Sequence, residues 1–443
     1  MSSQEEEAPG TGESDSDESE GLEPPPRPPP FSISKGWLQE VLGAALAPGR
    51  PFEVLHFAAK SGSEPLEGPP PPPGAVGDSA LSEVLSLHVQ YAAGPRGQTP
   101  GAVHLVLKLP PRDPVSRFFV SEAQFDLREI NFYTQIVPDL LAAGGDTLES
   151  DWLPIPHCLH ATYRASPHHS VLVLENLKAQ GYKSADFAEG LSLDQAKAAL
   201  EALARMHSLS LVLKVREGSD LLQRYPFLFK TAAATDSYQQ LVERGLPQLA
   251  RFLQRQADEH PGEDFACILE ALSALRPRTR SVIASLLAPR EPLALITHTD
   301  FWCSNLLFRT EEGVAEGAEG RPRCAILDWQ MVAYSHPAND LALLLVSSLD
   351  ARLRRAHAHE LLDWYLASLE RLCSALGVSI DALGYTAHML YADFKRSQLL
   401  ALLLCVGSVD VALGDTRTER RLMHVLRDLY DEGVLTDVVG GDE

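Results

Sequence analysis

The sequence predicts an α+β fold in which a sheet-rich first part precedes a larger, mainly helical part. Between residues 52 and 109, short segments show the two-residue alternation of half-buried strands. Beyond residue 192, apolar residues recur with helical spacing. A single hairpin over residues 306–327 interrupts these helices. We therefore expect two lobes, over residues 31–175 and 176–443.

Composition narrows the class of protein. A chain of 443 residues has room for two domain-sized units. Its net charge of −22 argues against a nucleic acid partner, because phosphate-backbone binding needs basic patches. Its six cysteines include no Cys-x-x-Cys pair, which favours reduced thiols and a cytoplasmic location. No apolar run is long enough to span a membrane, and the acidic start predicts no signal peptide.

Residues 1–30 are predicted to be a disordered, acidic and proline-rich tail. They contain nine acidic residues, seven prolines and a single arginine, too little apolar surface to offset the entropy of folding. A solubilising role is the simplest interpretation. Ser14, Ser16 and Ser19 are alternative phosphorylation sites, and residues 24–30 are an alternative polyproline II ligand for a protein partner.

The first lobe is expected to hold one helix and several strands. The helix covers residues 37–46, and strands follow at residues 52–59, 85–91 and 103–109. Lys108 lies on the last of these strands, on the opposite face from its apolar neighbours. The sheet therefore presents a lysine on one face and a core on the other.

A second helix in this lobe follows Pro111. Ser121 and Gln124 have the spacing of a capping box, although a start near Ser116 is also compatible with the pattern. Pro138 is expected to end the helix.

Glu129 falls within the apolar stripe of that helix. It shares a helical face with Phe125, Phe132 and Ile136. A carboxylate that faces the core needs a partner, and Lys108 on the preceding strand is the natural one. Taken singly, the two residues are compatible with a solvated lysine and a helix-flank charge. Together they favour a functional ion pair.

An apolar strand over residues 171–174 leads into Glu175 and Asn176, where the chain is expected to cross between the lobes. A capping box at Ser192 and Gln195 then starts a helix. His207 continues the apolar face of that helix, so we interpret it as a core histidine. Further helices are predicted at residues 237–256, 266–275, 360–376 and 385–406.

The hairpin brings three oxygen-bearing side chains together. Asn305 precedes its first strand and Asp328 follows its second, so the two should meet at the open end of the antiparallel pair. Asp300 lies on the loop that leads into the same end. Carboxylate and amide oxygens suit Mg²⁺ bound with nucleotide phosphates.

The order of these residues is typical of phosphotransferases with a kinase fold. His298, Asp300 and Asn305 form the pattern His-x-Asp-x-x-x-x-Asn, and Asp328 follows after a hairpin. In such enzymes the first aspartate accepts the proton of the substrate hydroxyl, and the asparagine and second aspartate hold the metal. A surface loop with these residues by chance is the alternative interpretation.

Longer segments resemble the ecdysteroid kinase-like family, which belongs with the choline kinases and aminoglycoside phosphotransferases. Residues 295–345 carry Leu-Ile-Thr-His-Thr-Asp-Phe-Trp-Cys-Ser-Asn, Ile-Leu-Asp-Trp-Gln and His-Pro-Ala-Asn-Asp-Leu-Ala. Residues 128–133, 172–177 and 203–207 are similar to segments of the same family, in the same order.

The resemblance implies a bilobal protein-kinase-like fold, with ATP and Mg²⁺ as cofactors. It implies that Asp300 is the catalytic base and that Asn305 and Asp328 bind the metal. It implies that Lys108 and Glu129 position the phosphates and that Asp340 braces the catalytic loop. In this fold the backbone of Leu174, Glu175 and Asn176 would contact the adenine.

Two features depart from the family. Thr299 stands where many relatives have glycine, and a β-branched residue narrows the allowed backbone conformations. A run of five prolines at residues 69–73 precedes the segment that replaces a glycine-rich phosphate loop. Gly77 and Ser79 in that segment are candidate phosphate contacts, and a simple turn is an equally good interpretation.

The sequence favours a small-molecule kinase over a protein kinase. Asp328 is followed by Trp329 and Gln330 instead of Phe-Gly, and the next helix starts near Pro337, which leaves no room for a peptide-binding activation segment. We therefore predict transfer of the γ-phosphoryl group of ATP to a hydroxyl of a small organic molecule. A catalytically inactive nucleotide-binding scaffold and a metal-dependent hydrolase are the alternatives. The sequence leaves open whether the acceptor is a lipid-like alcohol or an amino alcohol.

Overall fold

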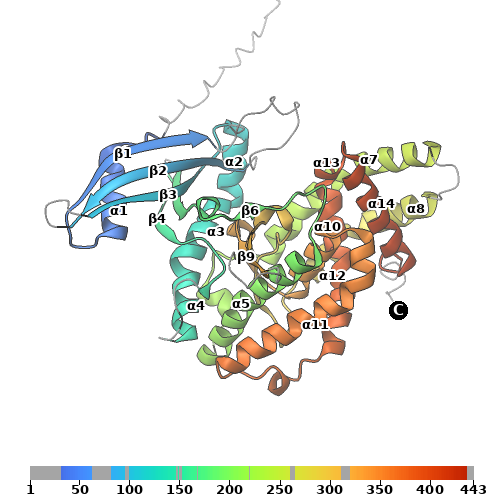
Figure 1. Ribbon diagram of the computed structural model, residues 1–443. Coiled ribbons are helices and arrows are strands. Elements are labelled where there is room, and N and C mark those ends of the chain that lie inside the picture. Colours follow the sequence, from blue (N-terminus) through green and yellow to red (C-terminus); the bar gives the residue numbers. More distant parts are fainter. Residues whose placement is uncertain are drawn as a thin grey trace, which may run out of the picture.

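The computed structural model describes residues 31–61, 81–94, 99–145, 148, 152–166, 168–218, 220–259, 265–310 and 320–436. The predicted tail over residues 1–30 and the segment with Gly77 and Ser79 lie outside the described residues. In the rest of the chain, an antiparallel sheet with its helix lies at one end and a larger helical lobe lies at the other (Figure 1). This arrangement confirms the predicted bilobal, protein-kinase-like α+β fold.

The first lobe is built on a five-stranded antiparallel sheet. Its spatial order is β1 (Phe52–Ser61), β2 (Glu83–Ala93), β3 (Thr99–Leu109), β5 (His169–Glu175) and β4 (Cys158–Arg164). Helix α1 (Lys35–Leu46) covers one face, where Leu38 and Leu42 share a core with Leu105 and Leu107 of β3. Because side chains alternate along a strand, Lys108 points to the other face, as predicted.

The helices after β3 differ from the prediction in two respects. They are α2 (Pro114–Ala123), α3 (Phe125–Asn131), the π-turn η2 (Phe132–Ile136) and α4 (Val137–Gly144). The predicted cap at Ser121 is wrong, because Asp113 caps α2 through the Ser116 N–H, and Gln124 adopts a left-handed conformation between α2 and α3. Pro138 does not end the helix. It lies in the first turn of α4, where a missing N–H costs little.

The second lobe is mainly helical. Its helices are α5 (Leu193–Glu217), α6 (Leu221–Arg224), α7 (Thr231–Glu259), α8 (Ala266–Leu275), α9 (Thr279–Leu287), α10 (Ala338–Ser348), α11 (Ala351–Ala375), α12 (Ala387–Gly407), α13 (Val409–Ala412) and α14 (Thr416–Asp431). The capping box of Ser192 and Gln195 at the start of α5 is confirmed.

Glycine allows two of these helices to cross closely. A Cβ atom on Gly245 of α7 would lie 1.8 Å from the carbonyl oxygen of Val406 on α12. Any larger residue would therefore push the two helices apart. This contact matters for function because α7 and α12 both contribute to a large cavity described below.

Short strands frame the predicted catalytic loop. Strand β7 (Leu295–Thr297) pairs with β10 (Ala333–Ser335), and the hairpin consists of β8 (Leu306–Thr310) and β9 (Pro322–Ile326), with β6 (Lys183–Ser184) beside β8. The chain between β7 and β8 is thus held at both ends by sheet hydrogen bonds. In the described part of the chain, no helix is both long and apolar enough to cross a membrane.

Candidate active site

The hairpin brings Asn305 and Asp328 to one end, as the sequence predicts. Leu306 pairs with Ile326, and the Leu327 N–H donates to the carbonyl oxygen of Asn305 at 2.8 Å. Asp328 then adopts a left-handed backbone with φ 63°, an uncommon conformation for a residue other than glycine. This turn separates Asp328 from the strand and directs the chain into the short helix η7 (Trp329–Met331).

Asp340 holds the loop before Asp300. Its two carboxylate oxygens accept the backbone N–H groups of His298 at 2.8 Å and Thr299 at 2.7 Å. The side chain is fully buried, so these bonds are shielded from water and are correspondingly strong. The geometry agrees with the bracing role that the family resemblance implies.

His207 lies behind Asp340, in the core position predicted for it. Its Nε2 is 3.3 Å from an Asp340 carboxylate oxygen, and its Nδ1 is 2.8 Å from the Tyr365 hydroxyl. The imidazole therefore lies beside Asp340 and is hydrogen-bonded to Tyr365.

His298 connects the loop to the hairpin. The Asp300 N–H lies 3.2 Å from His298 Nδ1, and His298 Nε2 lies 2.8 Å from the Leu327 carbonyl oxygen. A backbone N–H donates and a carbonyl accepts, so this pattern requires the neutral tautomer with its proton on Nε2. The backbone of Asp300 is thereby tied to the residue before Asp328.

The side chain of Asp300 is held by Asn305. The Asn305 amide donates at 2.9 Å to an Asp300 carboxylate oxygen and at 2.9 Å to its backbone carbonyl. Burial raises the pKa of Asp300, and the neighbouring Asp328 adds to this effect, while the Asn305 hydrogen bond opposes it. An aspartate with a raised pKa is a better proton acceptor than a fully solvated one.

Lys108 bridges two carboxylates. Its Nζ lies 2.6 Å from Glu129 Oε2 and 2.6 Å from Asp328 Oδ1. Burial by itself would lower the pKa of Lys108, but Asp328 and Glu129 raise it above its usual value. Burial raises the pKa of Glu129, and Lys108 opposes that change. The predicted Lys108–Glu129 pair is thus present, with Asp328 as an additional partner.

The oxygen atoms near the hairpin fit a hard divalent cation. Because Asn305 uses its NH₂ group for Asp300, its carbonyl oxygen is the atom left for a ligand. One carboxylate oxygen of Asp328 contacts Lys108, which leaves its second carboxylate oxygen for a cation. No three His, Cys, Asp or Glu side chains among the described residues converge as a metal site. Asn305 and Asp328 would therefore hold Mg²⁺ only together with nucleotide phosphates and water.

The segment between the lobes uses its N–H groups within the protein. The Glu175 N–H donates to the His157 carbonyl at 2.9 Å, and the Asn176 N–H donates to the His104 carbonyl at 3.0 Å. The Asn176 side chain contacts Ser86 at 3.1 Å. Contacts of Leu174, Glu175 and Asn176 with adenine remain a prediction. Because the N–H groups of Glu175 and Asn176 are already used, these two residues would contact adenine through their backbone carbonyl groups.

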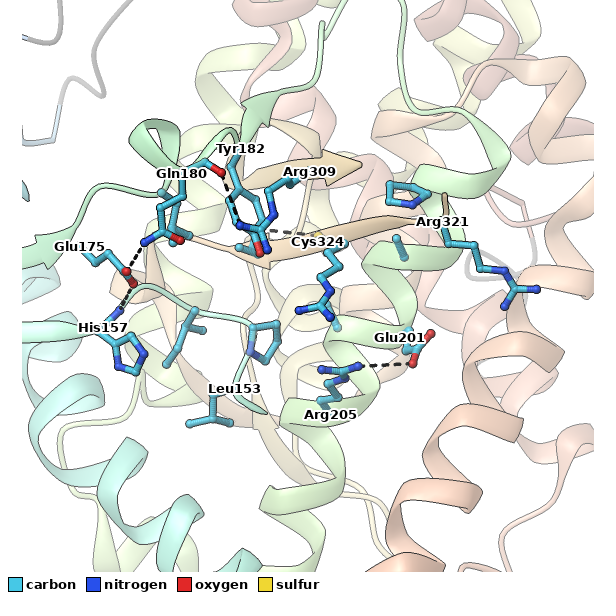
Figure 2. Close-up of a pocket in the computed structure, with 18 residues that line it drawn as sticks. Leu153, His157, Glu175, Gln180, Tyr182, Glu201, Arg205, Arg309, Arg321 and Cys324 are labelled. Atoms are coloured by element: carbon cyan, nitrogen blue, oxygen red, sulfur yellow. Dashed lines mark hydrogen bonds and ion pairs between the residues drawn. The ribbon is translucent and has the colours of Figure 1, made fainter. Parts of the chain in front are cut away.

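A cavity of about 380 Å³ adjoins this segment (Figure 2). Glu175 stands at one side of it, hydrogen-bonded to Gln180 and to the backbone N–H of His157. Arg205 and Glu201 form an ion pair at another side. This cavity is separate from the residues that surround Asp300.

A second cavity, of about 650 Å³, has Asp300 in its wall. Apolar side chains from α7, α10, α12 and α14 form most of the lining, together with Phe119, Phe187 and Trp302. Gln330 lines both this cavity and a small one of about 20 Å³ beside Lys108 and Glu129. The large cavity therefore adjoins Asp300, and the small one adjoins the Lys108–Glu129 pair.

Sequence reasoning missed several residues of this region. Tyr238 on α7 lies close enough to Asp300 for that carboxylate, after burial, to raise its pKa. Arg128 donates to the Gln330 carbonyl at 2.9 Å, which ties α3 to η7. No local pattern distinguishes Tyr238 from other aromatic residues of its helix. Arg128 is adjacent to Glu129 and is also buried. The reasoning that identified Glu129, a charged residue in apolar surroundings, could have identified Arg128 too.

Thr299 tolerates a backbone that favours glycine. Its φ is 61°, a conformation that costs a β-branched residue energy. Its N–H donates to Asp340, and its hydroxyl lies within hydrogen-bonding distance of the carbonyls of His298 and Met331. These bonds offset part of the cost of this backbone conformation for threonine.

The two-lobed fold and the cluster of Lys108, Glu129, Asp300, Asn305 and Asp328 define a kinase-like protein. The chain belongs to the ecdysteroid kinase-like family, whose model matches residues 76–378. No curated protein matches the chain.

Solved structures with a similar arrangement are small-molecule kinases. Choline kinase from Cryptosporidium parvum is 12% identical with a TM-score of 0.43, and covers 87% of this chain and 94% of its own. Choline kinase LicA from Streptococcus pneumoniae is 14% identical with a TM-score of 0.38, covering 89% and 98%. A glucosamine kinase bound to glucosamine, ADP and inorganic phosphate is 15% identical with a TM-score of 0.39, covering 91% and 84%.

Proposed function

We propose that this protein transfers the γ-phosphoryl group of ATP to a hydroxyl of a small, largely apolar molecule. The observation that carries the proposal is the position of Asp300, which lines the 650 Å³ cavity and is hydrogen-bonded to Asn305. Cavities of this size accommodate drug-sized ligands. The chain's membership of a kinase-like family supports the same reaction class.

In the proposed reaction, Asp300 orients the acceptor hydroxyl and takes its proton. The acceptor oxygen forms a bond to the γ-phosphorus while the bond between that phosphorus and the bridging oxygen breaks, so ADP leaves. Lys108, held by Glu129, orients the phosphates. Mg²⁺, held by Asn305 and Asp328 when bound, would neutralise phosphate charge. Asp340 keeps the loop rigid through the N–H groups of His298 and Thr299.

The lining of the cavity favours an acceptor without a positive charge. Among the described residues that line it, Asp300 is the sole carboxylate, and the other charged side chains are Arg244 and Arg421. A cationic amino alcohol would meet two arginines and no second carboxylate, which is electrostatically unfavourable. We therefore propose an apolar alcohol over an amino alcohol.

We also propose a cytoplasmic location, where ATP is available. The six cysteines support it, because all are free thiols in the structure, as expected in a reducing compartment.

Phosphoryl transfer to a metabolite extract tests the proposal. Wild type should incorporate label from γ-labelled ATP in the presence of Mg²⁺, and Asp300→Asn should lower the rate by about 10²–10⁴-fold. Asp363→Asn is the matched control, because Asp363 is a carboxylate that contacts Tyr391 away from the cavity. ATP binding without turnover in wild type would favour the inactive scaffold. Unimpaired activity of Lys108→Ala would favour the hydrolase.

A further inference from the structure

Arg421 of α14 is a buried cation with no carboxylate partner among the described residues. It is 7% exposed, its Nη2 donates to the Phe187 carbonyl at 2.7 Å, and its guanidinium lies 4.5 Å from the centre of the Phe187 ring. Within the described part of the chain, no carboxylate oxygen lies within 4.0 Å of it. Arg354 and Arg355, by contrast, share the carboxylate of Asp428. A buried charge without a partner is strongly destabilising, so its presence calls for an explanation.

The carboxylate that acts on Arg421 electrostatically is already engaged. Asp350 contributes to the electrostatic environment of Arg421, but it caps α11 by accepting the N–H groups of Arg352 and Leu353. Burial lowers the pKa of Arg421, and Asp350 offsets only part of this effect. Among the described residues, no carboxylate therefore neutralises this charge by direct contact.

Arg421 and Asp300 are connected by a continuous aromatic wall of the cavity. Trp302 follows Asp300 by two residues, and its ring lies 5.4 Å from that of Phe187 in an edge-to-face contact. Phe187 in turn stacks beneath Arg421. All four side chains line the same cavity. A molecule on this wall would have Asp300 near one end and Arg421 near the other.

We propose that Arg421 binds a carboxylate of the acceptor, and that the acceptor is an apolar hydroxy acid whose hydroxyl and carboxylate lie at opposite ends. This inference rests on the proposed function, because it takes the cavity to be the acceptor site. The ligand carboxylate supplies the missing counter-charge, and a charge-assisted bidentate pair with arginine is strong when buried. Arg421 is thus a specificity residue, and Asp300 acts on the hydroxyl.

Binding of matched acids and esters to the full chain tests the proposal. Calorimetry would compare ω-hydroxylaurate with its methyl ester, and lithocholate, which has a rigid body, with its methyl ester. Wild type should bind at least one acid about tenfold or more tightly than its ester. Arg421→Gln should lose this preference and Arg421→Lys should keep part of it. Arg251→Gln, which changes an exposed arginine of α7 outside the cavity lining, should keep it fully.

The proposal would be overturned if wild type bound neither acid more tightly than its methyl ester. It would also be overturned if Arg421→Gln still preferred the acid. The free protein gives a second criterion. Arg421→Met should unfold at the temperature of wild type or above it, because an uncompensated charge is removed. Arg354→Met, which breaks the pair with Asp428, should unfold at a lower temperature. An equal loss in both variants would mean that Arg421 is structural.

The outcomes separate this inference from the proposed function. Acid-selective binding without phosphoryl transfer would leave the carboxylate site intact and refute the kinase reaction. Equal phosphorylation of acid and ester would support the kinase reaction and refute the role of Arg421.

Discussion

Lys108 Nζ lies 2.6 Å from Asp328 Oδ1, so a strand of the first lobe is joined directly to the end of the hairpin in the second. The same atom lies 2.6 Å from Glu129 on α3. One ammonium group thus connects β3, α3 and the predicted metal-binding residue. The relative position of phosphates and metal depends on this group in the proposed reaction.

Lys108→Met should lower both stability and nucleotide affinity. The variant leaves Glu129 and Asp328 facing each other with little solvent, and removal of one partner from a buried ion pair costs about 3 kcal/mol. Urea unfolding measures the first effect and titration with ATP the second. Lys178→Met, at an exposed lysine beside the inter-lobe segment, is the control and should behave as wild type. Unchanged stability of Lys108→Met would contradict the bridging role.

Asp340→Asn should reduce turnover more than ATP binding. An asparagine offers one carbonyl oxygen, so one of the two N–H groups that Asp340 now accepts would face an NH₂ group. A buried N–H left without a partner costs about 1–3 kcal/mol and loosens the loop before Asp300. Steady-state kinetics separates kcat from the KM for ATP. Asp220→Asn, at an exposed cap of α6, controls for the substitution. A raised KM with unchanged kcat would refute a role in positioning Asp300.

Thr299 gives a prediction about the loop backbone. Thr299→Gly loses a hydroxyl bond worth about 1 kcal/mol but relieves a left-handed conformation that costs about 1–3 kcal/mol. It should therefore be close to wild type in stability. Thr299→Val keeps the strain and loses the hydroxyl, so it should be less stable by about 1–2 kcal/mol. Thermal unfolding distinguishes the variants, and a Val variant as stable as the Gly variant would contradict this balance.

Asp300 sets the acid limb of the pH–rate profile. As a base it must be ionised, and burial raises its pKa above the usual value of 3.8. Turnover should therefore fall, as pH decreases, at a pH above 3.8, because the protonated form cannot accept the acceptor proton. The profile of kcat against pH measures this limb. A rate that stays constant down to pH 3.8 would mean that Asp300 is not the base or is not perturbed.

Local sequence patterns predicted the parts of the site that are formed by elements adjacent in the sequence. The hairpin pairing places Asn305 and Asp328 at the same end. Glu129 lies in an apolar stripe, so its carboxylate needs a partner, and Lys108 is that partner. The capping box at Ser192 was correct. The same pattern at Ser121 was wrong, because Asp113 caps α2 and the helix begins close to the alternative start at Ser116. Such motifs identify a helix more reliably than its first residue.

The acceptor cavity could not be predicted because distant helices form it. Tyr238 and Arg421 come from α7 and α14, and helix packing over such sequence separations leaves little local signal. Arg421 is a partial exception. It falls in the apolar stripe of Thr418, Leu422 and Val425, as Glu129 does in its helix, and a charge at such a position indicates a buried partner or a ligand.

The most direct test of the proposed reaction is Mg²⁺-dependent transfer of label from γ-labelled ATP by wild type and Asp328→Ala. If Asp328 holds the metal, wild type will yield a labelled organic product only with a divalent cation, and Asp328→Ala will yield almost none at any Mg²⁺ concentration. Equal product from the two proteins, or no dependence on the cation, would contradict the account.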